Sequence, residues 1–411
     1  MRIIYIADSI VPSKAANSVH VMKMSAALAA LGNDVTLVVR RIPSRELAID
    51  GSPFAFYGVP SSFTLEKLDP WPIFATKATF AVQAARLARR RAADLVFSRS
   101  LAASAFSARL GIPVIYESHT PEREGNSRRL YGWLSRSPQL RTHVVITEAL
   151  KAHYVEERGV PGSRIFVAPD GADPVREASA AQVAGAGRPT DASGTAESLT
   201  SQGEADRGLV TDGSAPEGPA SADRRLRIGY VGHLYEGRGI DLILELARRL
   251  PEAEFHLVGG TDEDVARWSP EAESAGNVRL HGFLPPSRLD AYRQSFDILL
   301  APYARSVAVS GGGGLDTVKW MSPLKLFEYM AAGKAIVASH LPAIEEVVED
   351  GVNALLAAPG DPDDWEAKLR ALLHDAARRE RLGASALELF LEKYTWEKRA
   401  ERILEAARRT E

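Results

Sequence analysis

The sequence predicts an α/β protein of two domains, each built on a doubly wound parallel sheet. The chain has 411 residues, which is more than one ordinary hydrophobic core accommodates. Short apolar runs alternate with helical patterns in two separate series. Between the series, residues 176–224 contain no aromatic residue and few large aliphatic ones, so they cannot bury enough apolar surface to offset their ordering entropy. We therefore expect domains at 1–175 and 225–394, with a disordered linker or insertion at 176–224.

Five buried strands are expected in the first domain. Their apolar runs are too continuous for a half-exposed sheet and are typical of a parallel sheet covered on both faces. A helix should follow the first strand, with Asn17 or Ser18 as its cap and Gly32 at its end. The predicted strands are 3–6, 35–39, 95–97, 114–116 and 144–146.

The second domain repeats the pattern after residue 225. Its first strand is followed by a helix with Ile243, Leu246, Ala247 and Leu250 on one face. In such sheets ligands bind at the carboxyl ends of the strands, so a cleft between the domains is the expected site. The predicted strands are 226–231, 255–258, 278–280, 298–300 and 336–338.

The amino-acid composition of the chain excludes or disfavours several classes of function. A net charge of −3 with 25% charged residues does not favour nucleic-acid binding. The absence of cysteine excludes disulfides, thiolate metal sites and cysteine nucleophiles. No apolar run is long enough to span a bilayer, and the chain enters a strand at once, without the apolar region of a signal peptide. We expect a cytoplasmic protein, with contact at the inner face of the membrane as a further possibility.

Residues 320–340 contain the most informative helix of the chain. Ser322 is expected as the N-cap, Pro323 as the first helical residue and Gly333 as the end. The backbone N–H groups of Leu324 and Lys325 would then form an anion site at the helix start.

Lys325 and Glu328 are three residues apart and therefore share a face of this helix. A cation and a carboxylate beside an anion site suit a ligand that has both phosphates and hydroxyls. The alternative is a surface ion pair, worth a few tenths of a kcal/mol.

The string Ser322-Pro-Leu-Lys-Leu-Phe-Glu-Tyr-Met-Ala-Ala-Gly-Lys334 resembles the donor-binding segment of family 4 retaining glycosyltransferases. These enzymes have the GT-B fold, in which two Rossmann-like domains face each other across a cleft. The resemblance implies that Glu328 holds the ribose hydroxyls of a nucleotide-sugar and that Ser322, Pro323 and the helix start receive its diphosphate and sugar. Many members have a second glutamate eight residues earlier, which binds the donor sugar. Trp320 stands there, either stacking on the sugar or an acceptor, or merely packing.

The resemblance covers both domains and extends to the C-terminal residues 395–411, which correspond to the helix that returns to the first domain. It also implies further donor contacts in the loop Gly232–Gly239, where an arginine and a lysine usually clamp the diphosphate. His233 stands at the arginine position and Arg238 at the lysine position. Because a neutral histidine donates a single N–H, diphosphate affinity should depend on pH near its pKa. Loops toward the nucleotide base would include Gly259, Gly260, Gly282 and Phe283.

On the other side of the cleft, His119 matches the family's active-site histidine. Glu117 or Glu122 could orient its ring. By position after strands of the first domain, Asn17, His20 and Arg99 are candidate acceptor-side contacts, with helix capping as the alternative for the first two.

Two Asp-x-Asp strings, at 262–264 and 361–363, each precede a helical pattern. We interpret them as helix caps and expect no required metal and no cofactor, since the nucleotide-sugar is a substrate. The basic and aromatic stretch 128–136 can lie on an anionic membrane surface or form a solvated helix face.

The sequence therefore predicts a glycosyltransferase, of EC class 2.4, that moves a sugar from a UDP- or GDP-sugar to a glycan, lipid-linked or small-molecule acceptor. The resemblance implies retention of anomeric configuration. The alternatives are a nucleotide-sugar epimerase of the same fold and a non-catalytic nucleotide-sugar-binding partner subunit. Trp320 and His233 favour the last of these, because each removes a usual donor contact.

Overall fold

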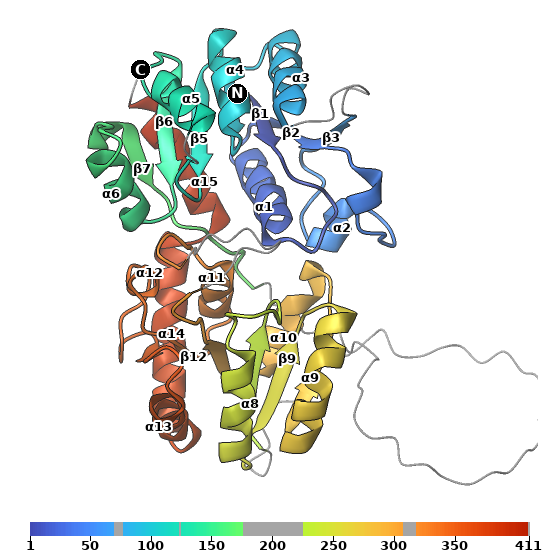
Figure 1. Ribbon diagram of the computed structural model, residues 1–411, viewed down its shortest axis with the longest axis vertical. Helices are drawn as coiled ribbons and strands as arrows, with labels where there is room; N and C mark the ends of the chain where they lie inside the picture. Colours follow the sequence, from blue (N-terminus) through green and yellow to red (C-terminus); the bar gives the residue numbers. More distant parts are fainter. Residues whose placement is uncertain (70–76, 123–124, 176–224, 307–317, 410–411) are drawn as a thin grey trace, which may run out of the picture.

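The computed structural model describes residues 1–69, 77–122, 125–175, 225–306 and 318–409. Two α/β bodies lie one above the other, the N-terminal one in blue to green and the second in yellow to red (Figure 1). The expected linker 176–224 falls outside the described residues.

The first body contains a seven-stranded parallel sheet in the order β3-β2-β1-β4-β5-β6-β7. All five predicted strands are confirmed, and two more flank them. β3 was not predicted because it is a half-exposed edge strand without a continuous apolar run, and β7 because it has only three residues. The strands are β1 Arg2–Ala7, β2 Asp34–Arg40, β3 Thr64–Leu68, β4 Leu95–Ser98, β5 Val114–Ser118, β6 Leu140–Val145 and β7 Ile165–Val167.

The helix after β1 begins earlier than predicted. α1 spans Ala16–Ala30, its N-cap is Ala15, and no side chain caps it. Asn17 and Ser18 lie inside the helix, and the Ser18 hydroxyl donates to the Ala15 carbonyl at 2.7 Å. The other helices of this body are α2 Pro53–Tyr57, α3 Lys77–Arg90, α4 Leu101–Arg109, α5 Asn126–Leu134 and α6 Glu148–Glu156.

The second body contains a six-stranded parallel sheet in the order β10-β9-β8-β11-β12-β13. Again the five predicted strands are confirmed, and the added β13 is only three residues long. The strands are β8 Arg227–Val231, β9 Glu254–Val258, β10 Val278–Leu280, β11 Ile298–Ala301, β12 Ala335–Ser339 and β13 Leu355–Ala357. The helices are α8 Ile240–Arg249, α9 Asp262–Ala275, α10 Leu289–Ser295, α11 Leu324–Ala331, α12 Pro342–Glu345, α13 Pro362–Leu373 and α14 Ala376–Lys393.

Both Asp-x-Asp strings cap helices, as predicted. Thr261 and Asp264 form a reciprocal capping box at the start of α9. The Asp361 carboxylate accepts from the backbone N–H groups of Asp363 and Asp364 at the start of α13.

The last helix, α15 (Trp396–Arg408), lies beside α1 in the first body although it follows α14 of the second (Figure 1). Its Ala400, Ile403 and Leu404 share a buried cluster with the α1 residues Val21 and Met24. The chain thus crosses between the bodies a second time, and the two crossings are hydrogen-bonded to each other. The Ala172 N–H donates to the Tyr394 carbonyl and the Trp396 N–H donates to the Ala172 carbonyl, both at 3.1 Å.

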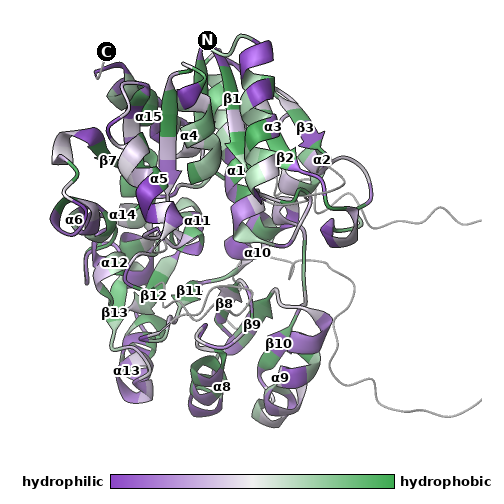
Figure 2. Cartoon of the chain, turned by 45° about the horizontal axis from the view of Figure 1, so that its top comes forward, coloured by the Kyte–Doolittle hydropathy of each residue, from purple (hydrophilic) through white to green (hydrophobic). Residues whose placement is uncertain are grey.

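The distribution of hydrophobic and hydrophilic residues agrees with this arrangement of strands and helices. In Figure 2 the strands are largely hydrophobic, while the outer helices such as α13 show hydrophilic residues on their exposed faces. Loops at the carboxyl ends of the two sheets meet between the bodies: Lys14, which follows β1, lies 4.4 Å from the ring centroid of Phe283, which follows β10. This meeting of strand ends is where a ligand is expected.

Candidate functional site

The start of α11 lies at the junction of the two bodies. The helix begins at Leu324, and Pro323 occupies the N-cap position without a side-chain capping hydrogen bond. The prediction that Ser322 is the N-cap was therefore wrong by one residue. The Ser322 hydroxyl instead accepts from the Asp170 backbone N–H of the first body at 2.8 Å. The Leu326 N–H of the first turn donates to the Pro323 carbonyl at 2.9 Å. The N–H groups of Leu324 and Lys325 lie at the first two helical positions, where a helix supplies no acceptor, so they are the ones available to a ligand.

Two cations lie side by side behind this helix start. The Lys325 ammonium is 3.8 Å from the ring centroid of Tyr230 and 5.1 Å from that of Tyr303. The Arg238 guanidinium is 5.4 Å from the Tyr303 centroid and donates to the Tyr235 hydroxyl. Within the described residues, neither cation forms an ion pair with a carboxylate. The structure therefore brings the predicted diphosphate residues together and leaves their charge uncompensated.

Burial shifts the pKa values of Lys325 and His233 at this site. The pKa of Lys325 is well below its usual range, because burial and then the nearby Arg238 disfavour the ammonium. The same two effects, burial first, lower the pKa of His233 to about 4. His233 is thus neutral at pH 7 in the free protein, so the predicted pH dependence shifts from the ordinary imidazole range to acid pH.

Glycines let the backbone approach these cations. A Cβ on Gly232 would lie 2.9 Å from the Lys325 ammonium nitrogen. Gly259 has a φ of +123°, and a Cβ there would lie 2.1 Å from the Gly232 carbonyl oxygen. The Gly259 N–H donates to the Gly282 carbonyl at 2.7 Å. The loops after β8, β9 and β10 are therefore packed backbone against backbone, and Gly260 continues the middle loop.

Phe283 closes this group of loops toward the first body. Its ring is stacked on Phe56 of α2 with centroids 6.4 Å apart, and the Lys14 ammonium lies over it. Of the residues predicted for the base side, Phe283 thus contacts the first body.

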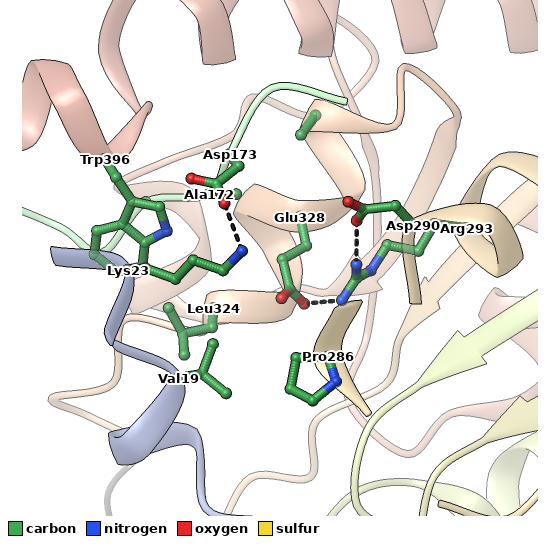
Figure 3. Close-up of a pocket in the computed structure, with 12 residues that line it drawn as sticks. Val19, Lys23, Ala172, Asp173, Pro286, Asp290, Arg293, Leu324, Glu328 and Trp396 are labelled. Atoms are coloured by element: carbon green, nitrogen blue, oxygen red, sulfur yellow. Dashed lines mark hydrogen bonds and ion pairs between the residues drawn. The ribbon is translucent and has the colours of Figure 1, made fainter. Parts of the chain in front are cut away.

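Glu328 lines a small pocket between α1, α10, α11 and α15 (Figure 3). Its Oε2 is 2.6 Å from Nη2 of Arg293, so the surface ion pair with Lys325 considered above is not formed. Across the pocket, Lys23 of α1 pairs with Asp173 at 2.5 Å. Sequence reasoning missed Arg293 and Lys23, because only the tertiary fold brings them to Glu328.

His119 directly follows β5 of the first body, and its side chain is 24% exposed. Its Nε2 lies 2.6 Å from Oε1 of Glu117. Of the two glutamates considered from the sequence, Glu117 is therefore the one that contacts the ring. Glu122 is engaged elsewhere, accepting from the hydroxyls of Tyr116 and Tyr154. Burial, with a contribution from Arg99, lowers the pKa of His119 to about 4, so the ring is neutral at pH 7.

Glu117 is the centre of a buried charge network. Its Oε2 is 2.9 Å from Nη2 of Arg399 on α15, and its Oε1 is 3.1 Å from Nε2 of His20. Although burial alone would raise it, the pKa of Glu117 is well below its usual range, chiefly because of Arg399 and His20. His20 is 1% exposed and its Nδ1 is 2.9 Å from Asp170, so it contributes to this network from below the cleft surface.

One cluster in the described chain has metal-ligand types. His20, His119 and Asp170 offer ligand atoms within 4.8 Å of one another. These atoms already face Glu117 or one another, and the guanidinium of Arg399 is in the same network. Each of these three side chains therefore already has a polar partner within the network.

Arg99 joins the network of Glu117, because its Nε is 3.5 Å from Oε1 of that carboxylate. Asn17 and Arg99 do meet: Nη1 of Arg99 donates to Oδ1 of Asn17 at 2.8 Å. The Trp320 ring is edge-on to His153 of α6, with centroids 5.4 Å apart, and Lys319 lies over it. Trp320 thus packs between the bodies. No helix in the described ranges is long and apolar enough to cross a membrane.

Both halves of the chain match models of glycosyltransferase families. Residues 18–176 match the family described as Glycosyltransferase Family 4, and residues 225–375 match Glycosyl transferases group 1. Together with the relatives below, these matches support a glycosyltransferase family of the family 4 type.

Two relatives illustrate the sequence similarity. The chain is 32% identical over 152 residues to the phosphatidyl-myo-inositol mannosyltransferase of Mycolicibacterium smegmatis, covering 37% of this chain and 36% of the relative. It is 28% identical over 218 residues to the D-inositol 3-phosphate glycosyltransferase of Geodermatophilus obscurus, covering 48% and 45%. The chain thus spans less than half the length of these relatives.

Solved structures show the predicted GT-B fold. The Anabaena protein HepE in complex with UDP superposes with a TM-score of 0.65 at 14% identity, covering 98% of this chain and 99% of that one. Sucrose-phosphate synthase from Thermosynechococcus elongatus gives a TM-score of 0.67 at 16% identity, covering 100% and 99%. At these identities the likeness establishes the fold alone.

Proposed function

We propose that this chain, with its two glycosyltransferase domains, transfers a sugar from a nucleotide-diphosphate donor to an acceptor with retention of anomeric configuration. The acceptor would be a glycan, a lipid-linked saccharide or a small molecule bound from the side of the first body. UDP is the first nucleotide to test, because the similar structure of HepE contains UDP.

The observation that carries the proposal is the uncompensated cation pair at the start of α11. Lys325 is 8% exposed and Arg238 shares the Tyr303 ring with it, yet no carboxylate of the described residues neutralises either. Charging a buried lysine that has no carboxylate partner is costly, so an anionic ligand that supplied the missing negative charge would favour the ammonium form of Lys325. A diphosphate at this place would receive two cations, the helix-start N–H groups and the backbone of Gly232.

The same groups would act in the reaction. When the sugar leaves the donor, negative charge grows on the diphosphate, and preorganised cations stabilise that charge more in a water-poor site than in solution. Glu328 would accept hydrogen bonds from ribose hydroxyls, and Ser322 and Pro323 would shape the helix start. His119 would approach the donor sugar from the opposite wall.

The carboxylates near His119 support front-face displacement over a covalent enzyme intermediate. Glu117 is fully buried and held by Arg399 and His119, while Asp170 is 5% exposed and faces His20. A nucleophile needs an unhindered approach to the anomeric carbon, which neither carboxylate has. We propose no metal requirement, since Lys325 and Arg238 supply the charge that a metal ion would otherwise bring.

A donor panel tests the proposal. The purified protein would be mixed with UDP-, GDP- and other nucleotide-sugars, and thermal shifts, donor hydrolysis and transfer to candidate acceptors would be measured. We expect one nucleotide class to raise Tm and its sugar to be released or transferred, with the product anomer matching the donor. Acceptor-free interconversion of nucleotide-sugars, or binding without any turnover, would overturn the transferase proposal.

A further inference from the structure

The side chain opposite Glu328 in the pocket is Arg293, from α10. It is only 3% exposed and contacts two carboxylates: Nη2 is 2.6 Å from Oε2 of Glu328, and Nη1 is 2.7 Å from Oδ1 of Asp290 (Figure 3). Asp290 is three residues earlier on the same helix, so it fixes the guanidinium from its own element. Arg293 thus meets Glu328 as an already oriented group.

The contact occupies only one oxygen of Glu328. Among the described residues, Oε1 has no hydrogen-bond partner, and the side chain remains 25% exposed at the pocket. A carboxylate with one oxygen held by a buried arginine has a restricted rotamer, so its free oxygen keeps a defined direction. A carboxylate oxygen with a fixed direction is a suitable hydrogen-bond acceptor for the hydroxyls of a ligand.

We propose that Arg293 is a positioning residue that keeps Glu328 ionised and directs its free oxygen to the ribose hydroxyls of the donor. This inference rests on the proposed function, because it assigns a role to a residue that acts through Glu328. In this proposal Arg293 acts only through Glu328 and makes no contact of its own with the donor sugar or the diphosphate.

Charge balance around Glu328 explains why an arginine is needed. Burial raises the pKa of Glu328, Arg293 is the largest opposing influence, Asp290 raises the pKa further and Lys23 of α1 lowers it. Lys325 and Tyr329 of the same helix and Tyr303 after β11 also face this carboxyl electrostatically, and Asp173 lines the pocket. Without Arg293, the carboxyl would take up its proton at higher pH and lose its acceptor-only character.

The test compares ribonucleotides with their 2′-deoxy counterparts. Affinities for UDP, 2′-deoxy-UDP, GDP, 2′-deoxy-GDP and pyrophosphate would be measured for the wild type, Arg293→Gln, Arg293→Lys and Glu328→Gln. The surface arginine variant Arg249→Gln is a matched control, because Arg249 also contacts several carboxylates but lies on α8. Because Arg293→Gln removes the ion-pair partner of Glu328, the double variant Arg293→Gln/Glu328→Gln provides a background without either charge.

We expect Arg293→Gln to lower the ribose-to-deoxyribose affinity ratio by about tenfold, the usual value of a hydrogen bond to a charged group, and to leave pyrophosphate affinity unchanged. The ratio in this variant should fall further as pH decreases from about 8 to about 5, whereas Arg293→Lys should restore much of it. The double variant should match Glu328→Gln, because Arg293 acts only through that side chain. Arg249→Gln should behave as wild type.

The outcomes separate the two proposals. If the wild type binds UDP or GDP in preference to the deoxy forms and Arg293→Gln keeps that preference at every pH, the role of Arg293 is refuted while the donor site stands. An additional tenfold loss in the double variant relative to Glu328→Gln would also refute it. If the wild type binds no nucleotide, the proposed function and this inference fall together.

Discussion

At the scale of single residues, the proposed site contains groups whose pKa values the fold has changed. Lys325, Glu328, His233 and His119 all have pKa values shifted by burial toward the neutral form. Shifts of this kind cluster at functional sites, although structural ion-pair networks also produce them. A bound ligand of opposite charge would therefore change the protonation state of these groups.

Lys325→Met should separate binding from stability. The variant should lose roughly tenfold to a hundredfold in affinity for UDP- or GDP-sugars, because a charge-assisted contact is removed. Its Tm should stay the same or rise, since a buried cation is replaced by an apolar side chain of similar size. Calorimetric titration and thermal melts measure both, with Lys393→Met as a control at a half-exposed lysine. Unchanged donor affinity would contradict the assignment of Lys325.

Binding of UDP should take up protons. In the free protein the pKa of Lys325 is well below its usual value, and a bound diphosphate would raise it. Between the free and bound pKa values, binding adds a proton to the protein, so affinity should fall as pH rises through that window. Below it, His233 gives the same sign near pH 4, the value to which its pKa is lowered. Calorimetry in buffers of different ionisation enthalpy detects this uptake; a buffer-independent enthalpy would argue against it.

His119→Ala should affect turnover more than donor affinity. The neutral ring contacts Glu117 in the first body, whereas Lys325 and Arg238 belong to the second. We expect kcat to fall by roughly tenfold to a hundredfold with donor Kd nearly unchanged. Steady-state kinetics with a binding isotherm checks this; an equal loss in Kd would place His119 in ground-state binding instead.

At the scale of elements, the loops after β8, β9 and β10 form the floor of the site. Their backbones touch at Gly232 and Gly259 in a way that no side chain would permit. This arrangement follows from parallel strands that end at the same edge of the sheet, with glycine where the backbones meet.

Gly259→Ala should therefore abolish donor binding while leaving the rest of the fold cooperative. The new Cβ would meet the Gly232 carbonyl oxygen at 2.1 Å, and φ is +123°, a conformation that alanine rarely adopts. The loops must separate, so the diphosphate site should be displaced and the free energy of unfolding should fall by about 1–3 kcal/mol. Gly351→Ala, with a φ of +76° and open space around it, controls for backbone strain alone. Equal donor affinity in both variants would contradict this role of Gly259.

The elements also show what the sequence could predict. Ten strands were correctly predicted because each presents a continuous apolar run, and the Asp-x-Asp caps because their carboxylates act on adjacent N–H groups. The edge strands β3, β7 and β13 are short or half-exposed, so their pairing depends on neighbours distant in sequence. For the same reason the ion pair of Glu328 with Arg293 could not be predicted, since helix spacing suggested Lys325 and the fold provided a closer partner.

At the scale of the whole molecule, the bodies are joined by polar contacts that local patterns did not reveal. Ser322 accepts from Asp170, and the Glu346 carboxylate accepts from the backbone N–H of Glu148 at the start of α6, at 2.9 Å. Trp320, in the place where the family usually has a glutamate, packs against His153 at this junction. The resemblance to family 4 glycosyltransferases implies a donor contact at this position. In the structure, the tryptophan instead contacts a residue of the other body.

The stability of the first body should depend on α15. Ile403 is 1% exposed in the cluster that α15 shares with α1. Ile403→Ala should lower the free energy of unfolding by about 3 kcal/mol through lost burial and the cavity left behind. Leu391→Ala, at a residue 45% exposed on α14, should change it little. Urea denaturation of both variants measures their free energies of unfolding. Equal losses in the two variants would contradict the placement of α15.

The late return of α15 has a consequence for biosynthesis. A ribosome releases the seven strands of the first sheet long before it makes Trp396–Arg408, so the apolar surface of α1 that this helix covers stays bare while the entire second body is translated. A nascent chain of this topology completes its first core last, and during that interval the uncovered face is where a chaperone would bind or a neighbouring chain would aggregate.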